Sequence, residues 1–242
     1  MIVLHEPKII ALKARKVAST SFEIALSKYA SHSSIITPIT KEDEGTRKNL
    51  GFRGAQNFQY TLNETFRLGT RELTKAILRG KLPRKYFNHI DAYSAKKYLG
   101  DRIWNGYTKV AIIRNPFDYA VSSYFWDQGK NASIDDFESW LLSNTHLLLM
   151  NNQQYRINGD WIIDFVIRYE HLENDIKMFE EKIPQIKGLW KTFSSINAKG
   201  QYRPRSAKIE TVFEKAPRAL LLIKEVYAEE IAEYGYHVPE AQ

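Results

Sequence analysis

The chain has 242 residues, of which 43% are hydrophobic and 26% charged, a composition typical of a globular protein that excludes a disordered or fibrous chain. Lys and Arg number 35 against 28 Asp and Glu, and the net charge of +7 favours an anionic partner such as nucleic acid, a phosphate-bearing ligand or an acidic polysaccharide. Cysteine is absent, which excludes disulfides, thiolate metal sites and a cysteine nucleophile.

The N-terminal segment predicts a buried strand that leads into a helix. Residues 8–13 form a short apolar run bounded by lysines, the pattern of a buried strand. Ser19, Thr20 and Ser21 then offer helix caps, and apolar residues follow at helical spacing. Because charges interrupt the apolar residues of segment 1–16, it predicts neither a signal peptide nor a membrane span, and we expect a cytoplasmic protein.

The next part of the chain combines a short strand, a charged segment and helices. Residues 34–39 predict a second strand, whereas residues 41–57 are charged and lack apolar periodicity, which predicts a mobile surface loop. Residues 64–82 predict a helix interrupted by Gly69, and residues 94–99 predict a shorter helix.

Two further strands each run into a helix. Residues 109–114 are a continuous apolar strand, after which Asn115 is expected to cap a helix that begins at Pro116. The same pattern returns as a strand over 164–168 and a helix over 172–183.

The C-terminal tail predicts an amphipathic helix over 216–234 that ends at Gly235. Three buried strands that each lead into a helix predict an α/β fold. We therefore expect a single domain over residues 1–242, with a parallel sheet flanked by helices on both faces.

Three segments should converge on one crevice, because ligands of such sheets bind beyond the carboxyl ends of the strands. These segments are residues 14–21, 114–123 and 168–170. The first places Arg15 and Lys16 before hydroxyl groups at a helix start, which are the parts of a phosphate site. It lacks the glycines and the Gly-Lys-Ser/Thr order of an ATP-binding loop, and on its own it fits equally well a basic residue before a capped helix.

The second segment adds Arg114 at a strand end and Ser122 two turns into the following helix. Side chains at these positions could grip a further phosphate. Each residue taken singly also fits a plain alternative, an arginine that closes a strand and a serine that faces solvent.

Together the segments resemble known motifs. The run Lys13-Ala-Arg-Lys-Val-Ala-Ser-Thr-Ser21 is similar to the 5′-phosphosulfate loop of sulfotransferases, and Arg114-Asn-Pro-Phe-Asp-Tyr-Ala-Val-Ser-Ser-Tyr124 is similar to their 3′-phosphate motif. Arg168-Tyr-Glu-His-Leu172 resembles the family's later Arg-Tyr/Phe-Glu-x-Leu element. The motifs occur in the family's order over about residues 8–172, whereas the C-terminal third is less recognisable.

The resemblance implies a P-loop-like fold that binds 3′-phosphoadenosine 5′-phosphosulfate (PAPS) and passes its sulfuryl group to a hydroxyl or amine. Lys16 takes the place of the family lysine that stabilises the leaving phosphate, so it is a candidate catalytic residue. The other candidate donor-binding residues are Arg15, Ala18, Ser19, Thr20 and Ser21 at the 5′ end, Arg114 and Ser122 at the 3′-phosphate, and Arg168 and Tyr169 in the third motif.

Two positions depart from the family pattern. Ser19 stands where many members have Gly, which predicts a less close approach of the backbone to the phosphate. Tyr119 stands where a second Arg often occurs, and Arg203 and Arg205 are candidates to supply that contact.

The metal requirement and the acceptor follow from the same comparison. A sulfuryl group carries less charge than a phosphoryl group, so we expect no obligatory metal. The spacing from Lys16 to Ser21 resembles the loop of carbohydrate sulfotransferases, which favours a sugar acceptor, and the 41–57 segment is expected on the acceptor side.

His89 is the candidate general base, because several sulfotransferases resemble this chain in having a histidine upstream of the 3′-phosphate strand. Imidazole has a suitable pKa near neutrality. A histidine that caps a helix or packs in the core is the structural alternative. Asp91, Glu42 and Glu44 are alternative bases.

The leading hypothesis is thus a PAPS-dependent sulfotransferase that acts on a carbohydrate. A P-loop nucleotide kinase is the alternative enzyme, disfavoured by the missing Gly-Lys-Ser/Thr. A non-catalytic binder of nucleic acid or sulfated polysaccharide is the alternative from another class, and nucleic acid is the less favoured partner.

Overall fold

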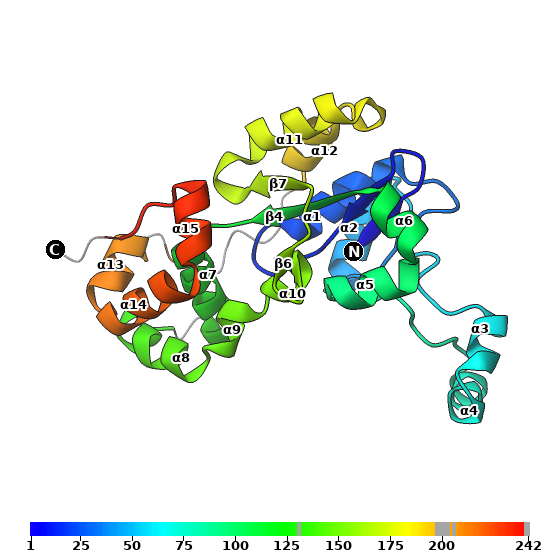
Figure 1. Ribbon diagram of the computed structural model, residues 1–242, viewed down its shortest axis with the longest axis horizontal. Coiled ribbons are helices and arrows are strands. Elements are labelled where there is room, and N and C mark those ends of the chain that lie inside the picture. The colour runs from blue at the N-terminus through cyan, green and yellow to red at the C-terminus, as the bar shows by residue number, and fades with distance from the viewer. Residues whose placement is uncertain (130–131, 197–203, 205–206, 240–242) are drawn as a thin grey trace.

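One mixed sheet organises the chain in the computed structural model (Figure 1). The structure describes residues 1–129, 132–196, 204 and 207–239. Within these residues the sheet has five strands in the order β3-β1-β2-β4-β7. Its strands are β1 (Ile2–Leu4), β2 (Ile9–Ala11), β3 (Ile35–Ile36), β4 (Thr108–Ile113) and β7 (Phe165–Arg168). β2, β4 and β7 are parallel, and β1 is antiparallel to both β2 and β3. A separate hairpin joins β5 (Arg156–Ile157) to β6 (Asp160–Trp161).

The expected strands at 8–13, 34–39, 109–114 and 164–168 are all present, although β3 keeps only two residues. The expectation of a wholly parallel sheet is wrong, because β1 lies antiparallel between β3 and β2. The apolar residues of β1 are fully buried, and Lys8 adopts a left-handed φ of 54° in the turn before β2. A tight hairpin therefore replaces the crossover that a parallel neighbour requires.

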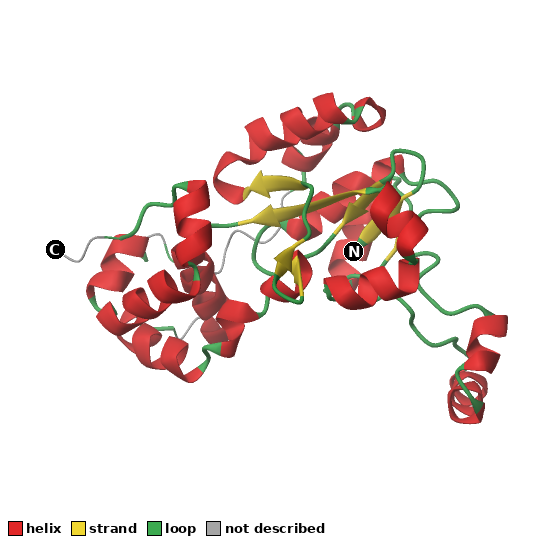
Figure 2. Cartoon of the chain, in the orientation of Figure 1, coloured by secondary structure: helices red, strands yellow, loops and turns green. Residues whose placement is uncertain are grey.

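Helices pack around this sheet in two groups (Figure 2). α1, α2, α11 and α12 contact one another in one group, and α5, α6 and α10 form another. The helices are α1 (Ser19–Leu26), α2 (Lys41–Asn49), α3 (Leu62–Arg67), α4 (Thr70–Arg79), α5 (Ala92–Leu99), α6 (Asp101–Gly106), α7 (Pro116–Gln128), α8 (Phe137–Ser143), α9 (His146–Leu149), α10 (Asn152–Tyr155), α11 (Leu172–Lys182), α12 (Leu189–Ser194), α13 (Ile209–Glu214), α14 (Pro217–Val226) and α15 (Ala228–Tyr234).

The start of α7 follows the sequence prediction. Pro116 is its first residue, and the Asn115 side chain accepts hydrogen bonds from the backbone N–H groups of Phe117 and Asp118. Since Pro has no N–H and a fixed φ, it suits the first helical position. The strand, cap and helix therefore form one rigid junction.

Part of the segment 41–57, which we expected to be a loop, is the helix α2. The Thr40 side chain accepts a hydrogen bond from the Asp43 N–H, and acidic and basic residues occupy the first and last turns respectively. The fully buried residue of this helix is Arg47. Because an ion-paired arginine lies where an apolar residue is usual, apolar periodicity missed the helix.

The expected C-terminal helix over 216–234 is two helices, α14 and α15, with a break at Tyr227. Tyr227 has φ −116° and ψ 26°, which are not helical values. Its buried ring and its hydroxyl, which donates to the Leu148 carbonyl, hold this break in place. Gly235 ends α15 in the left-handed conformation, as expected.

Two clusters of buried apolar side chains form the core of this α/β domain. One surrounds the sheet, and the other is built from α7, α8, α13 and α14. Residues of α7 such as Phe117 and Val121 belong to the second cluster, while α7 begins directly after the central strand β4. No helix within the described residues is long and apolar enough to cross a membrane.

Candidate functional site

Three segments of distant sequence meet at the carboxyl edge of the parallel strands. The loop 12–18 follows β2, Arg114 follows β4, and Tyr169 follows β7. Ala11 pairs with Val110, and Ile113 pairs with Arg168, so the three strands end at the same edge. This edge is where open α/β sheets bind ligands.

Arg114 contacts all three segments. Its Nη1 donates to the Lys16 carbonyl at 2.6 Å, and its Nε and Nη2 both lie 2.6 Å from Oδ2 of Asp118. Its guanidinium also lies over the Tyr169 ring, 4.1 Å from the centroid. The planar guanidinium suits such stacking together with several directed hydrogen bonds. Arg114 therefore fixes the loop and the end of β7 relative to α7.

The third motif contributes mainly to this framework. The Glu170 carboxylate accepts a hydrogen bond from the Asn115 N–H at 2.7 Å. Arg168 makes a bidentate ion pair with Asp175, at 2.9 and 2.8 Å. Burial alone would raise the pKa of Asp175, but the bonds from Arg168 lower it. The structure thus places the Arg168 side chain on α11 and leaves Tyr169 facing Arg114.

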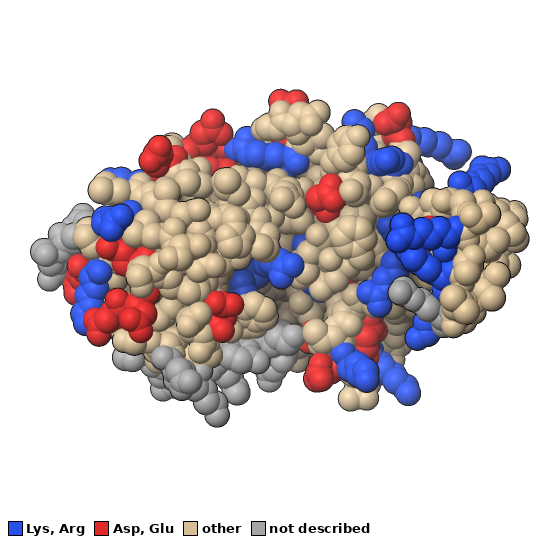
Figure 3. All heavy atoms as spheres, turned by 90° about the horizontal axis from the view of Figure 1, so that it is seen from below, with Lys and Arg blue, Asp and Glu red and all other residues tan. Residues whose placement is uncertain are grey.

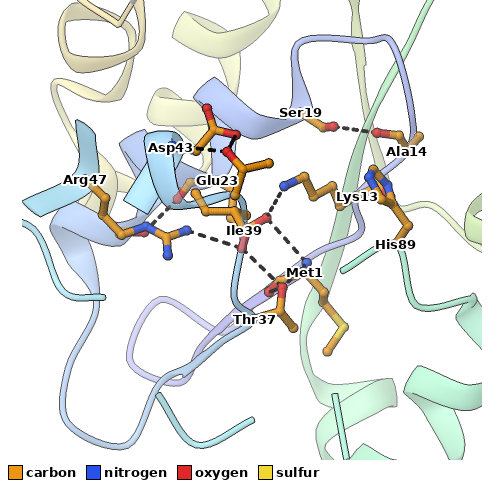
Figure 4. Close-up of polar contacts among 12 residues, drawn as sticks. Met1, Lys13, Ala14, Ser19, Glu23, Thr37, Ile39, Asp43, Arg47 and His89 are labelled. Carbon is orange, nitrogen blue, oxygen red and sulfur yellow. Dashed lines mark hydrogen bonds and ion pairs between the residues drawn. The ribbon is translucent and has the colours of Figure 1, made fainter. Parts of the chain in front are cut away.

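The loop before α1 has a constrained backbone. Lys16 and Ala18 have φ values of 61° and 59°, which L residues with a Cβ adopt at a cost. The Ser19 hydroxyl donates to the Ala14 carbonyl, an arrangement seen in Figure 4. Asn151, a buried residue, accepts from the Arg15 N–H at 2.9 Å and donates to the Arg15 carbonyl at 3.0 Å. Such strain persists only where surrounding contacts hold it.

The N-terminus of α1 points its unpaired N–H groups out of this loop. The Ala18 position provides no side-chain cap, and the intrahelical bonds begin with the Phe22 N–H donating to the Ala18 carbonyl. The N–H groups of residues 19–21 therefore have no partner within the helix. Thr20 is half-buried, whereas the side chains of Ser19 and Ser21 are buried. The groups of this turn that can bind an anion are therefore the backbone N–H groups and the Thr20 hydroxyl.

Lys16 lies beside one face of α7. Its ammonium is 5.4 Å from the centroid of the Trp126 ring, and Trp126 is 53% exposed. Asp118, Ser122 and Trp126 are spaced four residues apart and thus share this helical face. Ser122 is half-buried and lies on this face between Asp118, which pairs with Arg114, and Trp126, whose ring faces the Lys16 ammonium.

His89 lies at the same loop, from the other side. Its Nδ1 is 2.9 Å from the Lys13 carbonyl oxygen, and since a carbonyl only accepts, Nδ1 carries the proton and Nε2 holds the lone pair of the neutral ring. Burial lowers the pKa of His89 to about 4, with further lowering by the charges of Lys13 and Arg15. The pKa near 6.5 that we expected is therefore wrong for the free protein.

Lys13, the first residue of the loop motif, is buried and anchors the loop to α1. Its ammonium lies 3.1 Å from the Glu23 carboxylate, which also pairs with Arg47 at 3.4 Å and with the Met1 amino group at 3.5 Å (Figure 4). Burial would raise the pKa of Glu23, but the surrounding cations outweigh it and lower that pKa. This buried cluster fixes where the loop leaves β2.

The alternative bases have other roles or positions. Asp91 caps α5 by accepting from the Ser94 N–H at 2.7 Å, and Glu44 pairs with Arg47 at 2.8 Å. Glu42 is exposed on α2. Arg203 and Arg205 lie outside the described residues.

Sequence reasoning missed two residues that hold the site. Asn151 binds the Arg15 backbone across 136 residues of sequence, and the Gln154 amide donates to the His89 carbonyl at 3.1 Å. Both precede the β5–β6 hairpin, which the sequence did not predict either. Neither residue stands in a recognisable motif, so only the fold reveals them.

Comparison with known proteins gives one relative. A protein of Archaeoglobus fulgidus, described only as an "Uncharacterized protein", is 31% identical over 97 residues, which cover 38% of this chain and 80% of that protein. No family model matches the chain, and no solved structure matches it significantly.

Proposed function

We propose that this chain, which belongs to the same family as the Archaeoglobus fulgidus protein, is a sulfotransferase that moves a sulfuryl group from PAPS to an acceptor hydroxyl. The proposal rests on its own residues, because the relative's description names no activity. A P-loop-like fold, a carbohydrate acceptor and a cytoplasmic location remain predictions from the sequence.

One observation carries the proposal. Three segments that resemble the sulfotransferase motifs lie together, and Arg114 bonds to the first at Lys16, belongs to the second and stacks on the third at Tyr169. Parallel strands bring the segments that follow them to one end of any such sheet, so proximity alone does not support the proposal. The direct contacts of one motif arginine with the other two motifs support it.

The residues present fit the two anionic ends of PAPS. At the 5′ end, the uncapped N–H groups of α1, with Lys16 nearby, suit a phosphate. At the 3′ end, the contacts of Arg114 with Asp118 and Lys16 use three of its five N–H donors. One N–H on each terminal nitrogen is then left for a 3′-phosphate, with the Ser122 hydroxyl on the neighbouring helix face.

Two residues carry the chemistry in this proposal. The acceptor oxygen forms a bond to sulfur as the bond from sulfur to the 5′-phosphate oxygen breaks. Lys16 neutralises the negative charge that grows on that leaving oxygen, a role for a preorganised cation in a loose transition state. His89 Nε2 takes the acceptor proton, since Nδ1 already holds its own proton against the Lys13 carbonyl.

The low pKa of free His89 is compatible with this role. An anion within about 4–6 Å stabilises the protonated ring and raises its pKa. Bound PAPS brings such charge to the loop of Lys13 and Arg15, whose positive charges add to the lowering of the His89 pKa by burial. The base therefore strengthens when the donor is in place.

Calorimetric titration with 3′-phosphoadenosine 5′-phosphate (PAP), ADP and 5′-adenylate tests the proposal, together with transfer of labelled sulfuryl from PAPS to a panel of glycans. We expect PAP to bind much more tightly than ADP. Arg114→Ala should weaken PAP about tenfold or more, because charged hydrogen bonds contribute about 1.5–3 kcal/mol. It should weaken 5′-adenylate less, because that ligand senses only the lost bond to the Lys16 carbonyl.

Arg53→Ala is the matched control, because the Arg53 guanidinium donates to the Ala30 carbonyl at 2.8 Å, beyond the C-terminal end of α1 and so at the other end of that helix from the loop motif. A preference for ADP and loss of activity with EDTA would instead support the nucleotide kinase. Weak, salt-sensitive binding to every nucleotide would support a polyanion binder.

A further inference from the structure

The helices α3 and α4 form an arm that stands away from the sheet (Figure 1). We call residues 61–85 the arm. Backbone bonds tie its base, from the Tyr60 N–H to the Pro83 carbonyl at 3.0 Å and from the Lys85 N–H to the Phe58 carbonyl at 2.8 Å. α3 and α4 contact each other. The arm is therefore a separate helical hairpin on a short, hydrogen-bonded stem.

Large apolar side chains of the arm face solvent. Phe66 is 62% exposed, Ile77 is 71% exposed and Leu78 is 82% exposed. Leu62 and Leu68 are also exposed. Their concentration on one small projecting element differs from the single exposed apolar residues that ordinary surfaces carry.

The same arm holds much of the positive charge of the protein. It contains seven Lys or Arg and two Glu, a net +5 against +7 for the whole chain. Lys and Arg gather beside a tan, uncharged surface at the right-hand end of the molecule in Figure 3. Lys75, Lys81 and Arg84 also line a groove of about 590 Å³ below α4.

We propose that the arm docks on an anionic lipid bilayer, with its apolar side chains in the interface and its cations on the lipid headgroups. Amphipathic helices with basic polar faces bind membranes through this combination. A second copy of the chain would bring two strongly positive arms together, and a sulfated polysaccharide would use the cations without covering Phe66, Ile77 and Leu78. A lipid surface satisfies the charge and the apolar area at once.

Sedimentation of the full chain with lipid vesicles tests this. We expect binding to phosphatidylserine-rich vesicles, no binding to phosphatidylcholine vesicles, and weaker binding at high salt. The double variant Ile77→Ser/Leu78→Ser should weaken binding at least tenfold, because buried methylene groups drive interfacial insertion. Arg67→Gln/Arg71→Gln should weaken it about fivefold for each cation removed.

Leu221→Ser/Lys224→Gln on α14 is the matched control, since it removes one exposed apolar residue and one exposed cation far from the arm. It should bind vesicles like the unchanged protein, and circular dichroism melts should match for all variants. Equal binding to both vesicle types, or full binding by the Ile77→Ser/Leu78→Ser variant, would overturn the proposal. Self-association lost in that variant, without vesicle binding, would identify a second copy as the occupant instead, and heparin binding alone would identify a polyanion.

Discussion

His89 combines three constraints at a single residue. Its backbone φ is 57°, its Nδ1 donates to the Lys13 carbonyl, and its carbonyl accepts from Gln154. Histidine and asparagine tolerate the left-handed conformation better than most residues with a side chain. The position therefore selects a side chain that both accepts this backbone and reaches Lys13.

The lowered pKa of His89 makes the free energy of unfolding depend on pH. The ring has a pKa of about 4 in the folded chain and about 6.5 when unfolded, so between these values only the unfolded chain binds the proton. The stability that the neutral His89 ring contributes to the folded chain is fully present above pH 6.5 and is lost as the pH falls towards 4. Since 1 pKa unit corresponds to 1.36 kcal/mol, and the ring is partly exposed, we expect a loss of about 2–3 kcal/mol.

His89→Asn should remove this part of the acid sensitivity, because the Asn amide can still donate to Lys13 and fits the positive φ. Urea unfolding of both proteins at neutral pH and near pH 4 measures it. Between neutral pH and pH 4 the free energy of unfolding of the unchanged protein should fall by about 2–3 kcal/mol more than that of His89→Asn. An unchanged difference between them would show that the ring titrates as in water.

The sequence could identify His89 as a candidate but could not predict its pKa. Burial is the largest cause of the shift, and the neighbours that bury and charge it come from the loop after β2 and from α10. Those contacts exist only in the folded chain. The same reasoning applies to Asn151, whose bonds to Arg15 have no local signal.

At the scale of elements, α2 is a helix whose fully buried residue is charged. Arg47 is fully buried and pairs with Glu23 and Glu44, and its Nε has no hydrogen-bond partner among the described residues. Burying a charge costs several kcal/mol, which its partners repay only with good geometry. Periodicity of apolar residues predicted α1, but it cannot detect a helix whose buried face is an ion pair.

Two substitutions at Arg47 separate charge from volume. Arg47→Ala leaves a cavity and removes a partner of buried Glu23, so we expect it to lower the free energy of unfolding by about 3–5 kcal/mol. Arg47→Met fills most of the space and removes the unpaired Nε, while Lys13 still pairs with Glu23, so its loss should be clearly smaller. Urea unfolding gives both values. Equal losses would mean that the ion pairs, and not packing, hold α2.

At the scale of the whole molecule, α7 joins the two core clusters. Its N-terminal end is bound to the sheet edge through Arg114 and Glu170, and Phe117, Val121 and Tyr124 along the helix pack in the second cluster. The strand-to-helix junctions that build this connection were predictable from apolar runs, caps and Pro116. The antiparallel β1 was not, because three apolar residues at the N-terminus carry no signal of direction.

This connection predicts how a bound nucleotide affects the stability of the whole fold. A ligand that binds only the folded chain, at about 100 times its Kd, adds about 2.7 kcal/mol to the free energy of unfolding. For a chain of this size each kcal/mol raises Tm by about 2–4 °C, so PAP should raise Tm by about 5–10 °C and ADP by much less. Because α7 packs in the second cluster while its N-terminal end is bound to the sheet edge, we expect a single calorimetric transition that moves as a whole. Arg114→Ala, which weakens PAP about tenfold or more, should remove about half or more of the shift caused by PAP. Arg53→Ala should lower Tm without changing that shift. Two separate transitions, of which PAP moves only one, would show that α7 does not couple the clusters, and equal shifts with PAP and ADP would show that the 3′-phosphate is not recognised.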